Sequence, residues 1–258
     1  MKHLKIKPSE TTVDHRFQRE LDQRRVDAMA RAFNPNLVGV PVVSKRADGT
    51  YVRVDGQHRV AAAISADHGD VPMLMEVHEG LSLRDEAELF LRLNGGRTAV
   101  GAVDKFRARL VAQEPVALDI FATLKRLGCK IVKGRQRGGV SAVQAVEYAY
   151  HAGNLEGTIR TLVTWLDGDA EALEGEFIRA VSAFLVACPE ADPLHLAARL
   201  EEVAPTKLLN RLRRESQQVS NSKAEAARLV LTEIYNRKTR KTHQVSWSHG
   251  AERPAAEA

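Results

Sequence analysis

The chain has 258 residues, of which 28% are charged and 44% hydrophobic, values that are ordinary for a folded protein in water. Its length allows one large domain or two modest ones. No apolar run approaches the roughly 20 residues of a membrane-spanning helix, and the first residues lack the apolar segment of a signal peptide. The two cysteines, Cys129 and Cys188, are too far apart in sequence to suggest a disulfide framework or a metal site. We therefore expect a soluble, cytoplasmic protein with no membrane partner.

The net charge of +5 is distributed unevenly along the chain. Residues 105–137 hold nine basic and two acidic side chains. Residues 138–206 hold three basic and eleven acidic ones, and residues 207–258 hold eleven basic and five acidic ones. A single basic block is often only a solvated helix face. Two such blocks in one chain favour a polyanionic partner, because neutralised phosphates supply most of the affinity of nonspecific nucleic-acid binding.

The first hundred residues alternate between strand and helix patterns. Ser82 and Asp85 form a capping-box pattern, which predicts a helix from there to residue 91. Apolar residues at helical spacing predict two earlier helices, at 22–33 and 57–68. Runs rich in β-branched residues predict strands at 4–6, 38–44, 51–54 and 71–77.

After about residue 98 the sequence shows only helical patterns, separated by glycine and proline. The fold class expected is therefore α+β, with strands and helices first and an all-α half after them. The domains expected are 1–98, a helical domain at 99–240 and a disordered tail at 241–258. The predicted helices of the second half are 100–112, 116–127, 141–151, 155–166, 176–186, 192–203, 205–215 and 223–235.

One turn of the chain places a strand, a glycine and a helix in direct succession. The strand ends at Asp55, and Gly56 removes the side chain that would block the approach of a ligand. The N-terminus of the following helix attracts anions, and His58 and Arg59 add donors in its first turn. Asp55 could cap the helix, orient Arg59 or hold a metal. The alternative is an ordinary strand-to-helix turn with Asp55 as the N-cap residue.

The run Asp55–Arg59, followed by an alanine-rich helix, resembles the phosphate-binding turn of the ParB/sulfiredoxin superfamily. Residues 16–19 resemble the first box of that family, which ends in a Gln and an Arg near the nucleotide, and residues 94–97 resemble the Asn-x-x-Arg of its third box. The resemblance covers roughly residues 4–110 and implies a ParB/sulfiredoxin-like mixed sheet with helices in the first domain. The phosphate or nucleotide contacts that it implies are Gln18, Arg19, Gly56, Gln57, His58, Arg59, Asn94 and Arg97.

Departures from the superfamily's patterns narrow the range of activities that the resemblance implies. Sulfiredoxins place their catalytic cysteine where this chain has Gln57, which disfavours reduction of cysteine sulfinic acid. Chromosome-segregation ParB proteins bind CTP and carry a glutamate before the Asn of the third box, which helps hold the magnesium-bound triphosphate. Leu93 stands at that position, which puts CTP hydrolysis in doubt, and the central helix-turn-helix of those proteins is not recognisable. The spelling of the turn is closer to DGQHR-type ParB-like proteins of phages, mobile elements and defence loci, so the resemblance implies a bacterial or phage-encoded protein.

Two basic segments are candidates for charge-driven DNA contacts without sequence specificity. One surrounds glycine turns at 125–139, and the other includes 211–214 and 237–241. A solvated loop or tail is the alternative for each segment. The predicted DNA contacts are Lys130, Lys133, Arg135, Arg137, Arg211, Arg213, Arg214, Arg237 and Lys238.

The sequence therefore predicts a DNA-associated regulatory or partition-type protein with a nucleotide or phosphate at the Asp55–Arg59 turn. The resemblance implies CTP or ATP with magnesium as the cofactor, and the helical half would bind DNA or form a homodimer. One alternative is a nucleotide hydrolase or phosphotransferase with Asp55 as magnesium ligand or base, and another is a metal-dependent nuclease. The candidate catalytic residues are Asp55 and His58. A hydrolytic metal site needs converging ligands, and beyond these two residues the sequence offers none that are convincingly adjacent. A scaffold with a purely structural turn is the remaining alternative.

Overall fold

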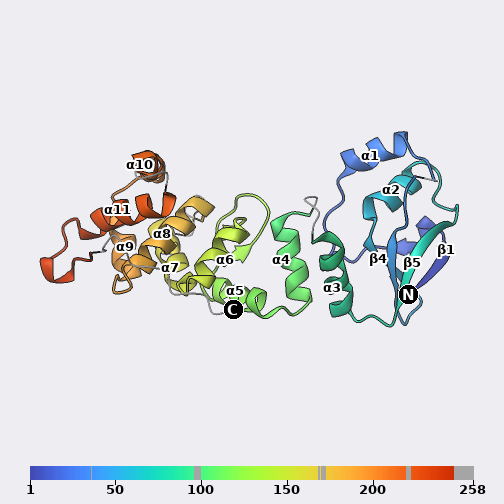
Figure 1. Cartoon of the computed structure of the whole chain (residues 1–258), viewed down its shortest axis with the longest axis horizontal. Coiled ribbons are helices and arrows are strands. Elements are labelled where there is room, and N and C mark those ends of the chain that lie inside the picture. The colour runs from blue at the N-terminus through green and yellow to red at the C-terminus, as the bar shows by residue number, and fades with distance from the viewer. Residues whose placement is uncertain (36, 96–99, 168, 170–172, 219–221, 247–258) are drawn as a thin grey trace. The chain divides into compact units, whose positions relative to one another are not determined.

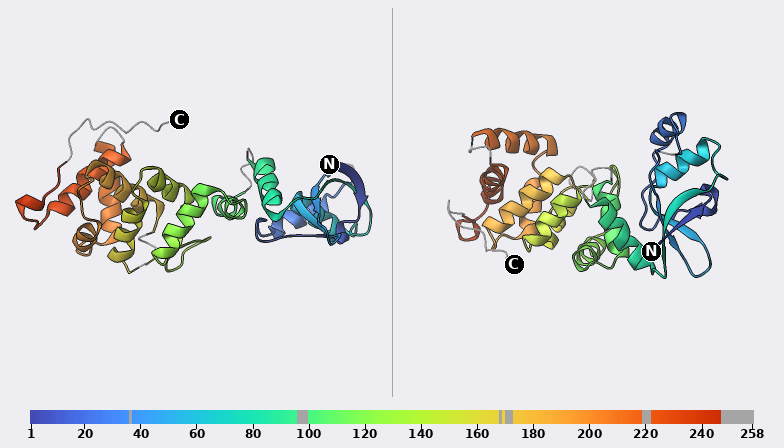
Figure 2. Two further views of the ribbon diagram at one scale, coloured as in Figure 1. Left: turned by 90° about the horizontal axis from the view of Figure 1, so that it is seen from below. Right: turned by 45° about the vertical axis from the view of Figure 1, so that its right-hand side comes forward.

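The computed structural model describes residues 1–35, 37–95, 100–167, 169, 173–218 and 222–246 (Figures 1 and 2). The chain forms two compact units, Met1–Leu118 and Asp119–Ala258, and helix α5 (Pro115–Arg126) contains the limit between them. Among the described helices, none is both long and apolar enough to cross a membrane. The domain limits expected from the sequence stay a prediction.

The first unit is built on a five-stranded mixed sheet with the strand order β1-β5-β3-β4-β2. Strand β1 pairs antiparallel with β5 and β3 antiparallel with β4, whereas β3 with β5 and β2 with β4 are parallel pairs. The predicted mixed sheet is confirmed, and the edge strand β2 was not predicted because two residues show no periodicity. The strands are β1 (Lys2–Ile6), β2 (Thr11–Thr12), β3 (Val42–Lys45), β4 (Tyr51–Asp55) and β5 (Met73–Glu79).

Apolar side chains cover both faces of this sheet, because successive residues of a strand point to opposite faces. On one face Val43 packs in a cluster with Val60 of α2, and on the other Val54 packs in a cluster with Phe90 of α3. In Figure 1, α1 lies beside α2, which it contacts. The capping box that was predicted for α3 is present. The helices of this unit that the structure describes are α1 (Gln23–Arg31), α2 (Gln57–Ser65), α3 (Leu83–Asn94) and α4 (Ala102–Val111), together with a 3₁₀ turn at Pro8–Glu10.

The second unit is mostly helical, so the α+β fold class is confirmed. Helix α8 is the most buried of its helices and packs against α6, α7 and α11, while α10 packs against α11. A short parallel pair of strands, β6 (Lys130–Ile131) and β7 (Gly139–Val140), departs from the all-α prediction for this half. The helices are α6 (Val143–His151), α7 (Leu155–Trp165), α8 (Gly175–Ala187), α9 (Pro193–Leu200), α10 (Pro205–Gln218) and α11 (Lys223–Asn236).

Part of the segment that was expected to be a disordered tail has defined structure. A 3₁₀ turn spans Lys241–His243, and Val245 is buried. The side-chain amide of Asn236 donates to the Val245 carbonyl at 2.7 Å and accepts from its N–H at 2.9 Å. These contacts anchor the chain as far as Val245, and residues 247–258 lie outside the described residues.

Candidate functional site

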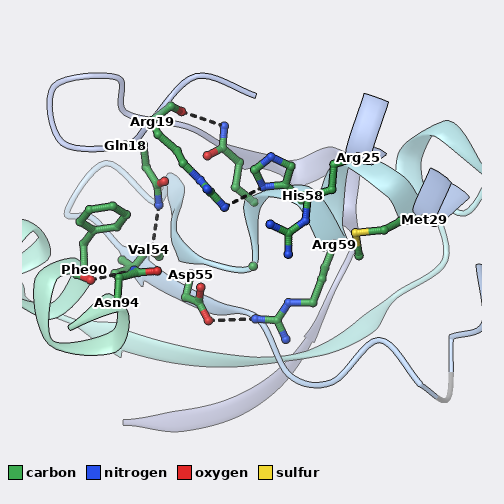
Figure 3. A pocket seen from close by; sticks show the side chains of 12 residues that line it. Gln18, Arg19, Arg25, Met29, Val54, Asp55, His58, Arg59, Phe90 and Asn94 are labelled. Carbon is green, nitrogen blue, oxygen red and sulfur yellow. Dashed lines mark hydrogen bonds and ion pairs between the residues drawn. The ribbon is translucent and has the colours of Figure 1, made fainter. Parts of the chain in front are cut away.

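A polar pocket of about 170 Å³ lies where β4 ends and α2 begins (Figure 3). The structure brings the predicted site residues together there from the loop before α1, the β4–α2 turn and the end of α3. Arg97, which was also predicted, lies outside the described residues. The residues that line the pocket are Gln18, Arg19, Arg25, Met29, Val54, Asp55, Gly56, Gln57, His58, Arg59, Phe90 and Asn94.

Gly56 is the residue that lets the β4–α2 turn open onto the pocket. It is the N-cap of α2 with φ +85°, a conformation that favours glycine. A Cβ at this position would lie 2.9 Å from the Cβ of Pro41 and 3.0 Å from Nη2 of Arg59. The alternative in which Asp55 is the N-cap is therefore wrong. Because no side chain caps α2, its first N–H groups are left to solvent or a ligand.

Arg59 is held by two contacts, one with a side chain and one with the backbone. Its Nη2 donates to Oδ2 of Asp55 at 2.9 Å, and its Nη1 donates to the carbonyl of Val38 at 3.2 Å. Asp55 thus orients Arg59, which was one of the three roles considered for it. The guanidinium braces the turn as well as lining the pocket, so its removal would disturb the fold and the site together.

The imidazole of His58 faces two N–H donors. The backbone N–H of Asp22 donates to Nε2 at 3.1 Å, and Nη2 of Arg19 lies 3.3 Å from Nδ1. Burial, followed by the charges of Arg19 and Arg25, lowers the pKa of His58, so the ring is neutral at neutral pH. A neutral imidazole has a single acceptor nitrogen and cannot accept both bonds.

Positive charge is concentrated at the same place. Figure 3 shows the side chains of Arg19, Arg25 and Arg59 reaching into the pocket from the loop before α1, from α1 and from α2. Burial lowers the pKa of Arg19, and the nearby charge of Arg25 lowers it further. Arg25 was not predicted as a site residue, because no sequence feature distinguishes it from the other charged residues of the predicted helix 22–33.

Three amides position the pocket wall. Nε2 of Gln18 donates to the carbonyls of Arg53 and Val54 at 3.1 and 2.7 Å, which fixes the loop before α1 to the end of β4. Nδ2 of Asn94 donates to the carbonyl of Phe90 at 2.8 Å. Nε2 of Gln57 donates to the carbonyl of Arg19 at 3.2 Å, and its buried Oε1 has no hydrogen-bond partner among the described residues.

A partly buried ion-pair network in the first unit was also missed. Arg46 donates to Oε2 of Glu86 at 2.5 Å and to Oδ2 of Asp14 at 2.7 Å, and Arg16 donates to the same Asp14 oxygen at 2.6 Å. The Glu86 side chain is 0% exposed and that of Asp14 is 8% exposed. The network connects the β3–β4 turn and α3 to the loop that carries Arg19.

The lining residues fit an anion better than a metal held by the protein. Among the described residues that line the pocket, Asp55 is the one carboxylate, and Arg59 already binds it. Within the described part of the chain, no group of three or more His, Cys, Asp or Glu side chains could hold a metal. The magnesium that the resemblance implies would therefore have to be held by the phosphates of a ligand.

The predicted DNA contacts are spread over the second unit, and many of them are in surface ion pairs. Arg135 pairs with Glu174, and Arg137 pairs with Asp167. Both partners belong to the acidic stretch 138–206. The other pairs are Arg211 and Arg237 with Glu233, Arg213 with Glu176, and Lys238 with Glu202. Lys130, Lys133 and Arg214 are exposed.

The fold and the site define an α+β protein with a cation-lined pocket at a strand-to-helix turn. Residues 13–245 match the family of unknown function DUF6551, and the chain belongs to that family.

Two solved structures of the C-terminally truncated chromosome-partitioning protein ParB from Caulobacter crescentus are similar to this chain. The one complexed with CTP-gamma-S shares 12% identity at a TM-score of 0.33, over 91% of this chain and 99% of that chain. The one complexed to the centromeric parS site shares 13% identity at a TM-score of 0.39, over 90% of this chain and 100% of that chain. No curated protein matches the sequence.

Proposed function

We propose that this chain is a ParB-like binding protein whose pocket holds the phosphates of a nucleoside triphosphate. The observation that carries the proposal is the imidazole of His58. Asp22 N–H and Arg19 both present a donor to it, and the neutral ring can accept only one of them. With Nε2 accepting from Asp22, Nδ1 carries the ring proton and points at Arg19. A phosphate oxygen that lies beside both nitrogens, which are 3.3 Å apart, would accept from both.

The remaining features of the pocket support the same ligand. The uncapped N-terminus of α2 contributes N–H groups and a partial positive charge, and Arg25 contributes a cation from α1. The volume of about 170 Å³ is below the roughly 300–1,000 Å³ that is typical of pockets that enclose a whole small molecule. We therefore expect the phosphates inside and the base at the rim, with CTP, ATP and GTP binding within about tenfold of each other.

Binding without turnover follows from the same residues. Asp55, which would be the base or metal ligand of a hydrolase or nuclease, is held by Arg59, and His58 is surrounded by donors. Neither side chain is placed to accept a proton from an attacking water. We expect the nucleotide to leave intact, with magnesium bound only through its phosphates.

Calorimetric titration with CTP, ATP, GTP and pyrophosphate tests the pocket, and α1 offers a matched pair of variants. Arg25 and Arg24 are neighbouring exposed arginines, and only Arg25 lines the pocket. Arg25→Gln is expected to weaken triphosphate binding about tenfold, the loss of one charge-assisted contact, while Arg24→Gln changes it less than twofold. Equal effects of the two variants, or no binding of any of the four anions, would contradict the proposal. Phosphate release in the same samples would contradict binding without turnover.

DNA association through the second unit is the second proposal. The Arg135 and Arg137 side chains are 70% and 73% exposed, and such exposed ion pairs contribute only about 0–1 kcal/mol. DNA phosphates can therefore replace Glu174 and Asp167 as partners at little cost. The pocket is tested by nucleotide titration of the Arg25 variants and this surface by DNA binding of variants in the second unit, so the two proposals can fail separately.

We expect weak binding of duplex DNA that decreases steeply with salt. The double variant Arg135→Gln/Arg137→Gln is expected to make the slope of log K against log [salt] shallower by about 1–2. Arg160→Gln is the control, because Arg160 is a half-exposed arginine that pairs with Glu156 outside the predicted contacts. Anisotropy of a labelled duplex measures the slope, and an unchanged slope in the double variant would remove Arg135 and Arg137 from the interface.

A further inference from the structure

We propose that the second unit has a separate binding site for one small amphipathic anion, an alkyl chain with a single carboxylate. The site is the groove between α10 and the helices α6, α8 and α11, with a volume of about 600 Å³. In Figure 1, α10 lies at the edge of this unit above α11, the helix that it packs against.

The groove has an apolar floor. The apolar side chains that line it are Leu209 and Leu212 of α10, Ala180 of α8, Ala224 of α11 and Tyr148 of α6. An apolar ligand that fills this groove of about 600 Å³ would remove its apolar lining from water, which is favourable. An alkyl chain has that shape and polarity.

The rim of the groove is positively charged. Arg213 is neutralised by Glu176 at 3.0 Å. Arg179 of α8 and Lys223 of α11 are exposed, and neither forms an ion pair within the described part of the chain. Two cations without carboxylate partners beside an apolar floor fit one anionic head group with its chain inside the groove.

The size of the groove favours a small molecule over a helix of a partner protein. A stable protein–protein interface buries about 800 Å² on each partner. The apolar floor here consists of five side chains, which is too few for such an interface. A volume of about 600 Å³ is within the usual range for a pocket that encloses one small ligand.

The test is a calorimetric titration of the full chain with octanoate, decanoate, dodecanoate and uncharged 1-octanol. We expect one saturable site whose affinity rises about fourfold with each added methylene until the groove is full. Leu209→Trp is expected to abolish binding by filling the groove. Leu209 is only partly buried, so the variant should fold, and its thermal unfolding would show this.

The head-group contact has its own control. The double variant Arg179→Gln/Lys223→Gln is expected to weaken decanoate binding about tenfold and to leave 1-octanol binding unchanged, while Arg160→Gln changes neither.

Binding that is not saturable, or that persists unchanged in folded Leu209→Trp, would overturn the proposed site. Equal weakening of decanoate and 1-octanol in the double variant would overturn the anionic head group. Binding of a phosphate-free alkyl anion is independent of the triphosphate pocket, so neither proposal depends on the other.

Discussion

Replacing Arg46 with methionine is expected to lower the free energy of unfolding by about 3–5 kcal/mol. The substitution would leave Glu86 with its carboxylate fully buried and without the cation that it now binds at 2.5 Å. An unpaired buried charge costs far more than a lost surface contact, since the carboxylate keeps its desolvation penalty and loses the attraction that offset it. Denaturant unfolding followed by circular dichroism measures the change.

Arg16 provides the matched control, because both arginines bind the same Asp14 oxygen. The Arg16 side chain is 59% exposed, so Arg16→Met is expected to cost less than about 1 kcal/mol. A cost below about 1 kcal/mol for Arg46→Met as well would show that Arg46 stabilises the fold only as a surface ion pair does.

The same network makes part of the stability depend on pH. The hydrogen bond from Arg16, followed by that from Arg46, holds the pKa of Asp14 well below its usual value of 3.8. A carboxyl group whose pKa is lower in the folded state stabilises the protein above its unfolded pKa, and this contribution is lost as the pH decreases towards the folded value. The difference in unfolding free energy between the wild type and Asp14→Asn is therefore expected to be largest above about pH 5 and to shrink below pH 4. A difference that does not depend on pH would show that Asp14 acts through shape alone.

The sequence was sufficient for the fold class because the signals that define it are local. The capping box at Ser82 and the glycine at position 56 each fixed a helix start within a few residues. The strands β2, β6 and β7 were missed because each has two residues, too few for a periodic pattern, and their pairing is decided by contacts distant in sequence.

In the candidate site, too, the residues close together in sequence were predicted and most of those distant in sequence were not. The Asp55–Arg59 turn is contiguous, so its chemistry was visible in the sequence, and the position of Gln18 and Arg19 opposite it came from a family resemblance. Arg46 and Glu86, by contrast, are 40 residues apart and meet only in the folded chain. The role of each side chain in the turn could not be predicted either. Only the structure shows that Arg59 binds the Val38 carbonyl and that His58 lies between two donors.

Replacing Arg19 with glutamine is expected to weaken triphosphate binding by one to two orders of magnitude while leaving the fold intact. A hydrogen bond between a charged donor and an anion contributes about 1.5–3 kcal/mol, which corresponds to that loss of affinity. Burial and the charge of Arg25 already lower the pKa of Arg19, so its charge is held at a cost in the ligand-free protein. We therefore expect the unfolding free energy of Arg19→Gln to stay within about 1 kcal/mol of the wild type.

Calorimetry with CTP and pyrophosphate, together with denaturant unfolding, separates the two roles that Arg19 could have. Arg19→Lys keeps the charge but loses the planar fork of the guanidinium, so its affinity should lie between those of the wild type and Arg19→Gln. Combining Arg19→Gln with His58→Asn should cost less than the sum of the single effects, because a phosphate oxygen that binds both groups couples them. Additive losses would place the anion elsewhere in the pocket. If Arg19→Gln kept its affinity but lost more than 1 kcal/mol of unfolding free energy, Arg19 would be a structural residue. Removing a side chain that binds the ligand lowers the affinity, whether or not the fold is affected.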